Sequence, residues 1–150
     1  MFTTIATFAL LLHTVTLTIT VNNDDAYVYD GEQIMPVVYN YNMSSSVSLA
    51  ANACVLSVLA VNIATGGSSG ILASTSTGVV TDDSWKCSSE LQTPGWHEPN
   101  FDDAAWAQAR VVAPNDGSSF AFIADISPDA KWIWAEDTSS HVAFCRKTLC

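Results

Sequence analysis

Short apolar segments separated by turn residues run along most of this chain. Residues 14–21 alternate strictly between threonine and aliphatic side chains, a pattern typical of a half-buried strand and not of a membrane helix. Asp30-Gly31 lies between two apolar segments and predicts a hairpin turn, so residues 33–39 should return antiparallel to residues 26–29. Residues 54–62 are the most continuously apolar, which predicts a central strand covered on both faces.

The same pattern continues to the end of the chain. Further strands are predicted at residues 47–51, 71–77, 110–113, 131–134 and 141–148. Residues 84–106 differ, because Trp85, Trp96 and Trp106 stand there among turn formers and acids, and two prolines exclude regular structure. A short helical turn is expected at residues 104–107. Together these features predict an all-β fold, an antiparallel β-sandwich of the jelly-roll type with a long tryptophan-rich wrapping connection.

The first residues are apolar and poor in charge. Residues 5–12 could form the apolar core of a secretory signal, but the basic segment that precedes such a core is missing. Two interpretations of residues 1–13 therefore stay open, a signal peptide or a truncated leading strand. Residues 14–150 form the predicted sandwich domain. No membrane insertion is expected, because threonines interrupt the apolar run too early for a spanning helix.

Composition narrows the classes of partner. The chain has 150 residues, enough for one domain, and 49% of them are hydrophobic while only 13% are charged. The formal net charge is −10, and the five lysines and arginines are scattered. Nucleic acid is excluded as a partner, because phosphate neutralisation needs clustered basic residues. The acidity also disfavours anionic membranes. It permits neutral sugars, cations or a basic protein.

Four cysteines and a glycosylation motif favour an oxidising, extracellular environment. The motif places a candidate glycan on Asn42. The cysteines lack the short paired spacing of a zinc site, and we expect a bridge between Cys87 and Cys145. Cys54 is either a buried thiol or the partner of Cys150. We therefore expect a secreted protein.

Four segments carry a resemblance to a known family. They are the hairpin at residues 17–32, the strand, glycine loop and return strand at residues 55–74, the Trp … Trp … Asp-Asp-x-x-Trp-x-x-Ala pattern of residues 85–109, and the Trp-Ile-Trp and arginine segments at residues 131–147. Read together, they resemble the galactose-binding-like β-jelly-roll superfamily of discoidin-like and carbohydrate-binding-module-like domains. The resemblance implies a sandwich that binds glycans through loops at one end.

The tryptophan segment supplies the candidate binding residues. Trp96 stands between Gly95 and His97 on an irregular loop, and is the predicted stacking residue for a sugar ring. His97 and Glu98 are expected beside it, with the imidazole bonded to a sugar hydroxyl.

Five other residues are expected to be structural. Trp85 and Trp106 should fill the core and hold the connection in place, while Asp102 or Asp103 caps a turn. Arg146 is expected to pair with an acid such as Asp103 and so tether the connection to the last strand.

No catalytic pattern stands out, and we expect no enzyme activity. Asp102 and Asp103 are adjacent and cannot flank a cleft, and the histidines lie in no nucleophile motif. Asn23, Asp24 and Asp25 offer oxygen ligands for calcium, although without the spacing of an EF-hand loop; no other cofactor is expected.

The preferred hypothesis is a secreted, non-catalytic carbohydrate-binding module whose partner is a glycan or glycoprotein. The first alternative is a structural or adhesive matrix domain that contacts calcium or protein. The second is the accessory-domain fragment of a glycoside hydrolase.

Overall fold

The computed structural model describes residues 14–150 except 23, 32, 36–37, 40–42 and 65–66. Predictions for residues 1–13, Asn23 and Asn42 lie outside this part of the chain. All regular structure within it is β-strand, which confirms the predicted all-β class.

No helix among these residues is long and apolar enough to cross a membrane.

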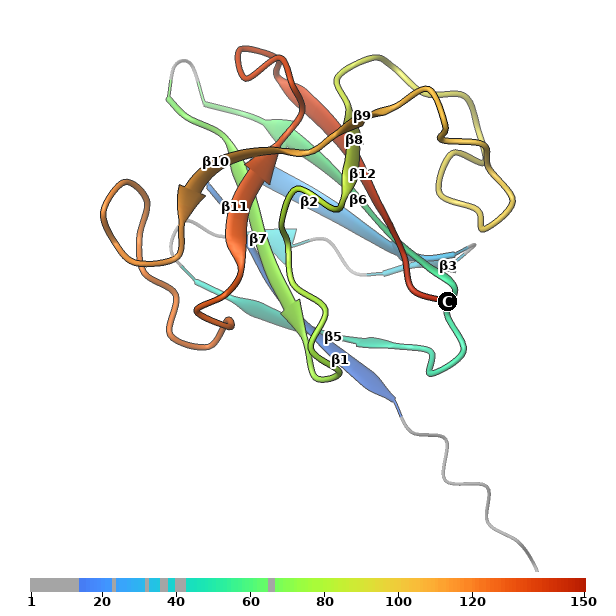
Figure 1. Cartoon of the computed structure of the whole chain (residues 1–150), viewed down its shortest axis with the longest axis horizontal. Coiled ribbons are helices and arrows are strands. Elements are labelled where there is room, and N and C mark those ends of the chain that lie inside the picture. Colours follow the sequence, from blue (N-terminus) through green and yellow to red (C-terminus); the bar gives the residue numbers. More distant parts are fainter. Residues whose placement is uncertain (1–13, 23, 32, 36–37, 40–42, 65–66) are drawn as a thin grey trace, which may run out of the picture.

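Two antiparallel sheets face each other (Figure 1). In the described part of the chain the first sheet has five strands, in the spatial order β10 (Arg110–Pro114), β11 (Lys131–Trp134), β7 (Gly70–Thr75), β1 (Val15–Asn22) and β5 (Ser45–Leu49). The second has seven in the same part, in the order β3 (Gln33–Ile34), β2 (Asp24–Asp30), β6 (Val55–Asn62), β12 (Val142–Thr148), β8 (Lys86–Ser88) and β9 (Ala107–Gln108), with β4 (Val38–Tyr39) also paired to β2. This is the β-sandwich that the strand pattern predicts.

The alternating segment at the start becomes β1 because one set of its side chains is apolar. Leu17, Ile19 and Val21 are fully buried between the sheets. The apolar run at 54–62 becomes β6, which lies between β2 and β12, so the expectation of a central strand is confirmed. Asp30 and Gly31 end β2 at a turn, with Gly31 at φ 74°, and β3 and β4 return antiparallel as predicted.

Large rings fill the space between the sheets. Trp85 and Trp134 lie in the main core together with the aliphatic side chains of β1, β6 and β7. Trp132 belongs to a second cluster, in which it packs with Leu72 and Ile126 under the segment that joins β10 to β11. The core therefore extends from the middle of the sandwich to the base of its loops.

The helical turn expected at residues 104–107 is not formed. Ala104 and Ala105 make a turn, and Ala107–Gln108 is the short edge strand β9. This strand pairs with β8, and Ala109 N–H donates to the Trp85 carbonyl at 2.8 Å. Pairing with β8 provides backbone partners that one helical turn could not, so the edge of the sheet prevails over the local helix signal.

All four cysteines form disulfides. Cys87 and Cys145 are directly opposite each other on β8 and β12, which confirms the predicted bridge. Cys54 pairs with Cys150, so of the two interpretations left open by the sequence the second is correct. The first bridge ties the strand before the tryptophan connection to the last strand, and the second fixes the end of the chain beside β6.

Removing the buried bridge should destabilise the sandwich strongly. The Cys87→Ala/Cys145→Ala variant opens a loop of 58 residues, and we expect its free energy of unfolding to fall by about 4 kcal/mol on chain-entropy grounds. Urea unfolding of the variant and the parent, both kept oxidised, measures this difference. A loss below about 1 kcal/mol would mean that the bridge does not constrain the unfolded chain as expected.

Candidate functional site

The connection between β8 and β9, residues 89–106, contains most of the candidate residues (Figure 1, yellow and light orange). It has no regular strands, and a series of turns closes it: Trp96 N–H donates to Thr93 O, Glu98 N–H to Gly95 O, and Phe101 N–H to Glu98 O. The shape of the connection therefore depends on contacts that its side chains and carbonyls make with the rest of the sandwich.

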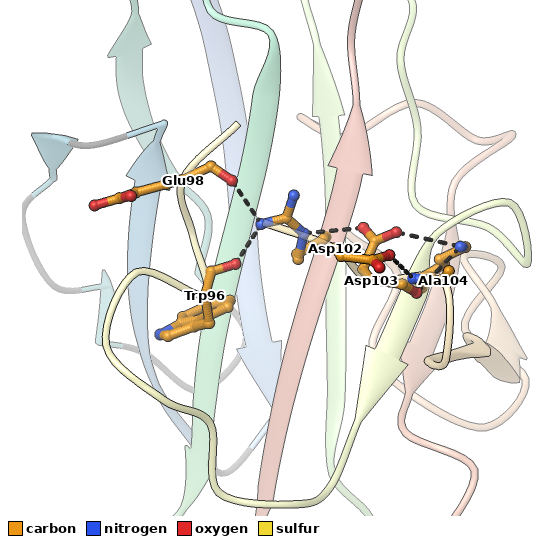
Figure 2. Close-up of polar contacts among 7 residues, drawn as sticks. Trp96, Glu98, Asp102, Asp103 and Ala104 are labelled. Carbon is orange, nitrogen blue, oxygen red and sulfur yellow. Dashed lines mark hydrogen bonds and ion pairs between the residues drawn. The ribbon is translucent and has the colours of Figure 1, made fainter. Parts of the chain in front are cut away.

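The main outside contact is Arg146 of β12. Its side chain is only 3% exposed. The guanidinium Nε donates to Asp103 Oδ2 at 3.0 Å, which is the ion pair expected from the sequence. Nη1 donates to the carbonyl of Glu98 at 3.0 Å and to that of Trp96 (Figure 2). The guanidinium carbon lies 5.1 Å from the centre of the Phe101 ring, within the range of a cation–π contact.

The two adjacent aspartates have different partners. Asp103 bridges two cations, since its other oxygen accepts from Lys86 Nζ at 3.2 Å. Asp102 accepts from the Ala104 amide at 3.0 Å, a local turn cap (Figure 2). Both carboxylates therefore have structural contacts, as the sequence suggested, and they form no pair across a cleft.

Trp96 is not the exposed ring that the sequence analysis expected. It is 6% exposed, and other rings surround it: Phe144 edge-on at 5.0 Å, Tyr29 edge-on at 5.4 Å, and Trp106 roughly parallel at 6.3 Å. The contact between Arg146 and the Trp96 carbonyl fixes the loop so that the indole is turned into this cluster. Trp96 therefore lacks an open face on which a sugar could stack.

His97 and Glu98 accompany Trp96 in the loop. The His97 ring stacks on Tyr29 at 4.3 Å, and its Nδ1 lies 2.7 Å from the Gly31 carbonyl, so it joins the connection to the β2–β3 turn. Burial raises the pKa of the Tyr29 phenol above its ordinary value, and the neighbouring Tyr27 adds to this. Glu98 contributes its carbonyl to Arg146, and its side chain is half-buried. These contacts tie the connection to the sandwich.

The other two tryptophans of the segment, Trp85 and Trp106, differ in how deeply they are buried. Trp85 is fully buried, as predicted, and its indole N–H donates to the Val80 carbonyl at 2.8 Å. Trp106 is only half-buried, so the prediction that it fills the core is wrong. One side of its ring packs near Trp96, and Phe101 meets it edge-on at 5.7 Å.

The Trp106 ring lines a groove with a volume of about 330 Å³. We call it the Trp106 groove, and its lining residues are Cys87, Ser88, Ser89, Glu90, Gln92, Ala105, Trp106, Ala107 and Glu136. They come from β8, the start of the connection, the turn before β9, the first residue of β9 and the loop after β11.

Several polar groups in this groove have no partner among the residues that the structure describes. The carboxylates of Glu90 and Glu136 are exposed and make no hydrogen bond or ion pair with any described residue. Gln92 donates through Nε2 to Ser88 Oγ at 3.2 Å and to the Glu90 carbonyl at 2.7 Å, which fixes the amide and leaves its oxygen available as an acceptor. An indole beside fixed acceptors can hold a ligand that has apolar C–H faces and hydroxyl donors.

The sequence does contain a signal for this groove. Trp106 stands between Ala105 and Ala107, whose small side chains leave the space beside the indole open. Residues 88–92 gather serine, glutamate and glutamine next to a strand. Glu136, however, comes from a loop that is distant in sequence, and only the fold brings it to the same place.

The calcium hypothesis stays a prediction. Asp25 lies within β2, in register with Val61 of β6. Asn23 and the side chain of Asp24 lie outside the part of the chain that the structure describes. Elsewhere in the described ranges no three His, Cys, Asp or Glu side chains are grouped so as to hold a metal ion.

One curated relative shares part of the sequence. A stretch of 71 residues is 30% identical to the α-L-rhamnosidase of Streptomyces avermitilis. The match covers 47% of this chain and 7% of the bacterial protein, so the chain spans less than a tenth of that relative's length. No family model matches the chain, and no solved structure matches it significantly.

The ion pair of Arg146 should be essential to stability. Asp103→Ala leaves a buried guanidinium without its carboxylate, and we expect it to lower the free energy of unfolding by about 3 kcal/mol or more. Asp102→Ala removes only a turn cap and should cost about 1 kcal/mol or less. Equal losses in urea unfolding of the two variants would show that the guanidinium does not depend on Asp103.

Trp96→Ala should also affect the fold. Deleting a buried indole at the centre of an aromatic cluster typically costs about 3–5 kcal/mol, so we expect a much lower melting temperature. Differential scanning calorimetry measures it, with Leu91→Ala, an exposed position on the same connection, as the control. A variant that melts like the parent would place Trp96 at the surface after all.

Proposed function

We propose that this protein is a secreted, non-catalytic carbohydrate-binding module that holds a neutral sugar in the Trp106 groove. The observation that carries the proposal is the half-buried Trp106 beside polar groups that have no partner within the described part of the chain. A pyranose offers a C–H face to an indole and hydroxyl donors to carboxylate and amide oxygens. Two disulfides and the sandwich fold support a role outside the cell.

The charges in the groove favour a neutral ligand. Glu90 and Glu136 both line it and would repel an acidic sugar. Hydroxyl groups of a neutral sugar can donate to both carboxylates without cost from like charges. The partner that fits this site is therefore a neutral glycan, free or on a glycoprotein.

Binding is a better account of the groove than hydrolysis. Enzymes commonly exclude bulk water from the bond that they break. The side chains of Glu90 and Glu136 are exposed to water. The carboxylates suit hydrogen bonding to a sugar rather than proton donation to a leaving group.

The partial similarity to a rhamnosidase supports a carbohydrate-related role. L-rhamnose is therefore the first neutral sugar to test, followed by other neutral glycans. A second candidate function, that of an accessory domain attached to a glycoside hydrolase, is favoured by the same alignment, which covers a small part of a large enzyme. A catalytic domain in the same polypeptide would support that candidate.

Binding should depend on the groove and not on the Trp96 loop. We expect the protein to bind neutral glycans on an array, and Trp106→Ala to abolish the signal because the stacking surface is lost. Gln92→Ala should weaken binding about tenfold, because the sugar loses one hydrogen bond to the Gln92 amide oxygen. Isothermal titration calorimetry gives the affinities.

Glu98→Gln is the matched control, because Glu98 lies on the same connection but outside the groove. Melting curves show whether Trp106→Ala is folded, and Gln92→Ala provides a second test that does not remove a packed ring. The proposal fails if no neutral glycan binds, or if Glu98→Gln weakens binding while Gln92→Ala does not.

A further inference from the structure

We propose a second binding site, separate from the Trp106 groove, which takes a carboxylate-bearing sugar unit such as a uronic acid at Arg110. The site is a groove of about 450 Å³ between three loops and the start of β10. We call it the Arg110 groove. It shares no lining residue with the Trp106 groove.

Three separate connections build the Arg110 groove. Ser68 and Ser69 come from the β6–β7 loop, Ser119 and Phe120 from the β10–β11 segment, and Thr138 from the β11–β12 loop. The groove thus combines one cation, one aromatic ring and several hydroxyls. Hydroxyl side chains can both donate to and accept from the hydroxyls of a sugar, and a ring can cover a C–H face.

Arg110 and Lys131 are the two cations whose side chains make no hydrogen bond or ion pair with the described residues, and of these two it is Arg110 that lines the groove. Lys86 and Arg146 both pair with Asp103, and Lys147 donates to Ser84 Oγ at 2.6 Å. The pKa of Asp116 is lowered by hydrogen bonds from Ser118 and, to a smaller extent, by the charge of Lys131. In a chain with a net charge of −10, an exposed arginine without an acidic partner has its charge available for a ligand.

Asp116 and Asp137, which flank lining residues of this groove in the sequence, are engaged within their own loops, and nearby Glu136 lines the Trp106 groove instead. Asp116 accepts from the Ser118 amide at 2.9 Å, and Asp137 accepts from the Ser139 amide at 3.0 Å and from its hydroxyl at 2.6 Å. Neither acid lines the groove. The carboxylates therefore stabilise the turns that present the groove instead of neutralising Arg110.

Several contacts fix the walls before any ligand arrives. Asn22 Nδ2 donates to the Ser68 carbonyl at 2.6 Å, which holds Ser68 beside the end of β1. The Phe120 ring packs at 5.0 Å on the buried Trp132 ring. Trp134 Nε1 donates to Ser140 O at 3.3 Å and holds the loop that carries Thr138. A preformed groove loses little conformational entropy on binding.

The single cation decides the class of ligand. The planar fork of arginine matches a carboxylate with two parallel hydrogen bonds. A polyanion such as nucleic acid or a heavily sulfated glycan needs several clustered cations, and the rest of this acidic surface would repel it. One negative charge on a hydroxyl-rich ligand fits both the groove and the net charge of the molecule.

The test compares two uronides with a neutral glycoside, and methyl glucuronide differs from methyl glucoside only at C6. The full chain is titrated with methyl glucuronide, methyl galacturonide and methyl glucoside while amide chemical shifts are followed by NMR. We expect a uronide to shift the amides of Arg110, Ser119 and Thr138, and the neutral glucoside to leave them unchanged. Binding should weaken at higher salt, because a charge pair at a surface is screened.

Arg110→Gln should weaken uronide binding at least about tenfold, since a charge-assisted pair is lost. Lys147→Gln also removes one positive charge, but Lys147 does not line the groove, so this variant should keep its affinity for the uronide. Equal binding of the glucoside, no uronide binding, or an unchanged affinity in Arg110→Gln would each overturn the proposal. Equal shifts with sodium acetate would reduce the site to a simple anion contact and would also overturn it.

The outcome is independent of the first site. Gln92→Ala, which affects the Trp106 groove, should keep its affinity for the uronide, and Arg110→Gln should keep its affinity for neutral glycans. If Gln92→Ala abolished uronide binding, the acidic sugar would be bound in the Trp106 groove and not at Arg110.

Discussion

The fold of the long connection depends on one buried cation. Placing a guanidinium inside a protein costs several kcal/mol unless hydrogen-bonding partners surround it. Residues 96–103 provide them, with the Asp103 carboxylate on one side and the carbonyls of Trp96 and Glu98 on another, while the Phe101 ring lies against the guanidinium. A segment without strands thereby acquires one defined path, because any other path would leave Arg146 charged and unpaired.

That path decides which aromatic ring meets the solvent. Because the Trp96 carbonyl accepts from Arg146, the Trp96 ring lies among Tyr29, Phe144 and Trp106. Trp106 is then left at the edge of the cluster, supported from one side and open toward a groove. An indole supported in this way has little freedom to lose, so a ligand that stacks on it pays a smaller entropic cost than on a mobile side chain.

The strands could be predicted from the sequence because their signals are local. The alternation of residues 14–21 and the Asp30-Gly31 turn each specify one element without reference to the rest of the chain. The relative exposure of Trp96 and Trp106 could not be predicted in the same way, since both stand among turn residues and small or polar neighbours. What separates them is a contact between Arg146 and the Trp96 carbonyl. Arg146 is 50 residues from Trp96, and the residues next to Trp96 in the sequence do not indicate so distant a partner.

The residues that line the two grooves could not be predicted from local sequence patterns either. Glu136 lines one groove and Thr138 lines the other, although only one residue stands between them, and it is Asp137, which is bonded to Ser139 within the loop. A loop fixed by its own turn can therefore place different chemistry on its two sides, acidic beside Trp106 and hydroxyl-bearing near Arg110. Composition alone, at a net charge of −10, favours neutral or cationic partners everywhere on the surface. Local charge differs from the average because three of the five cations are engaged by other side chains, while Arg110 lines a groove whose described residues include no acid and can act on a ligand in an otherwise acidic protein.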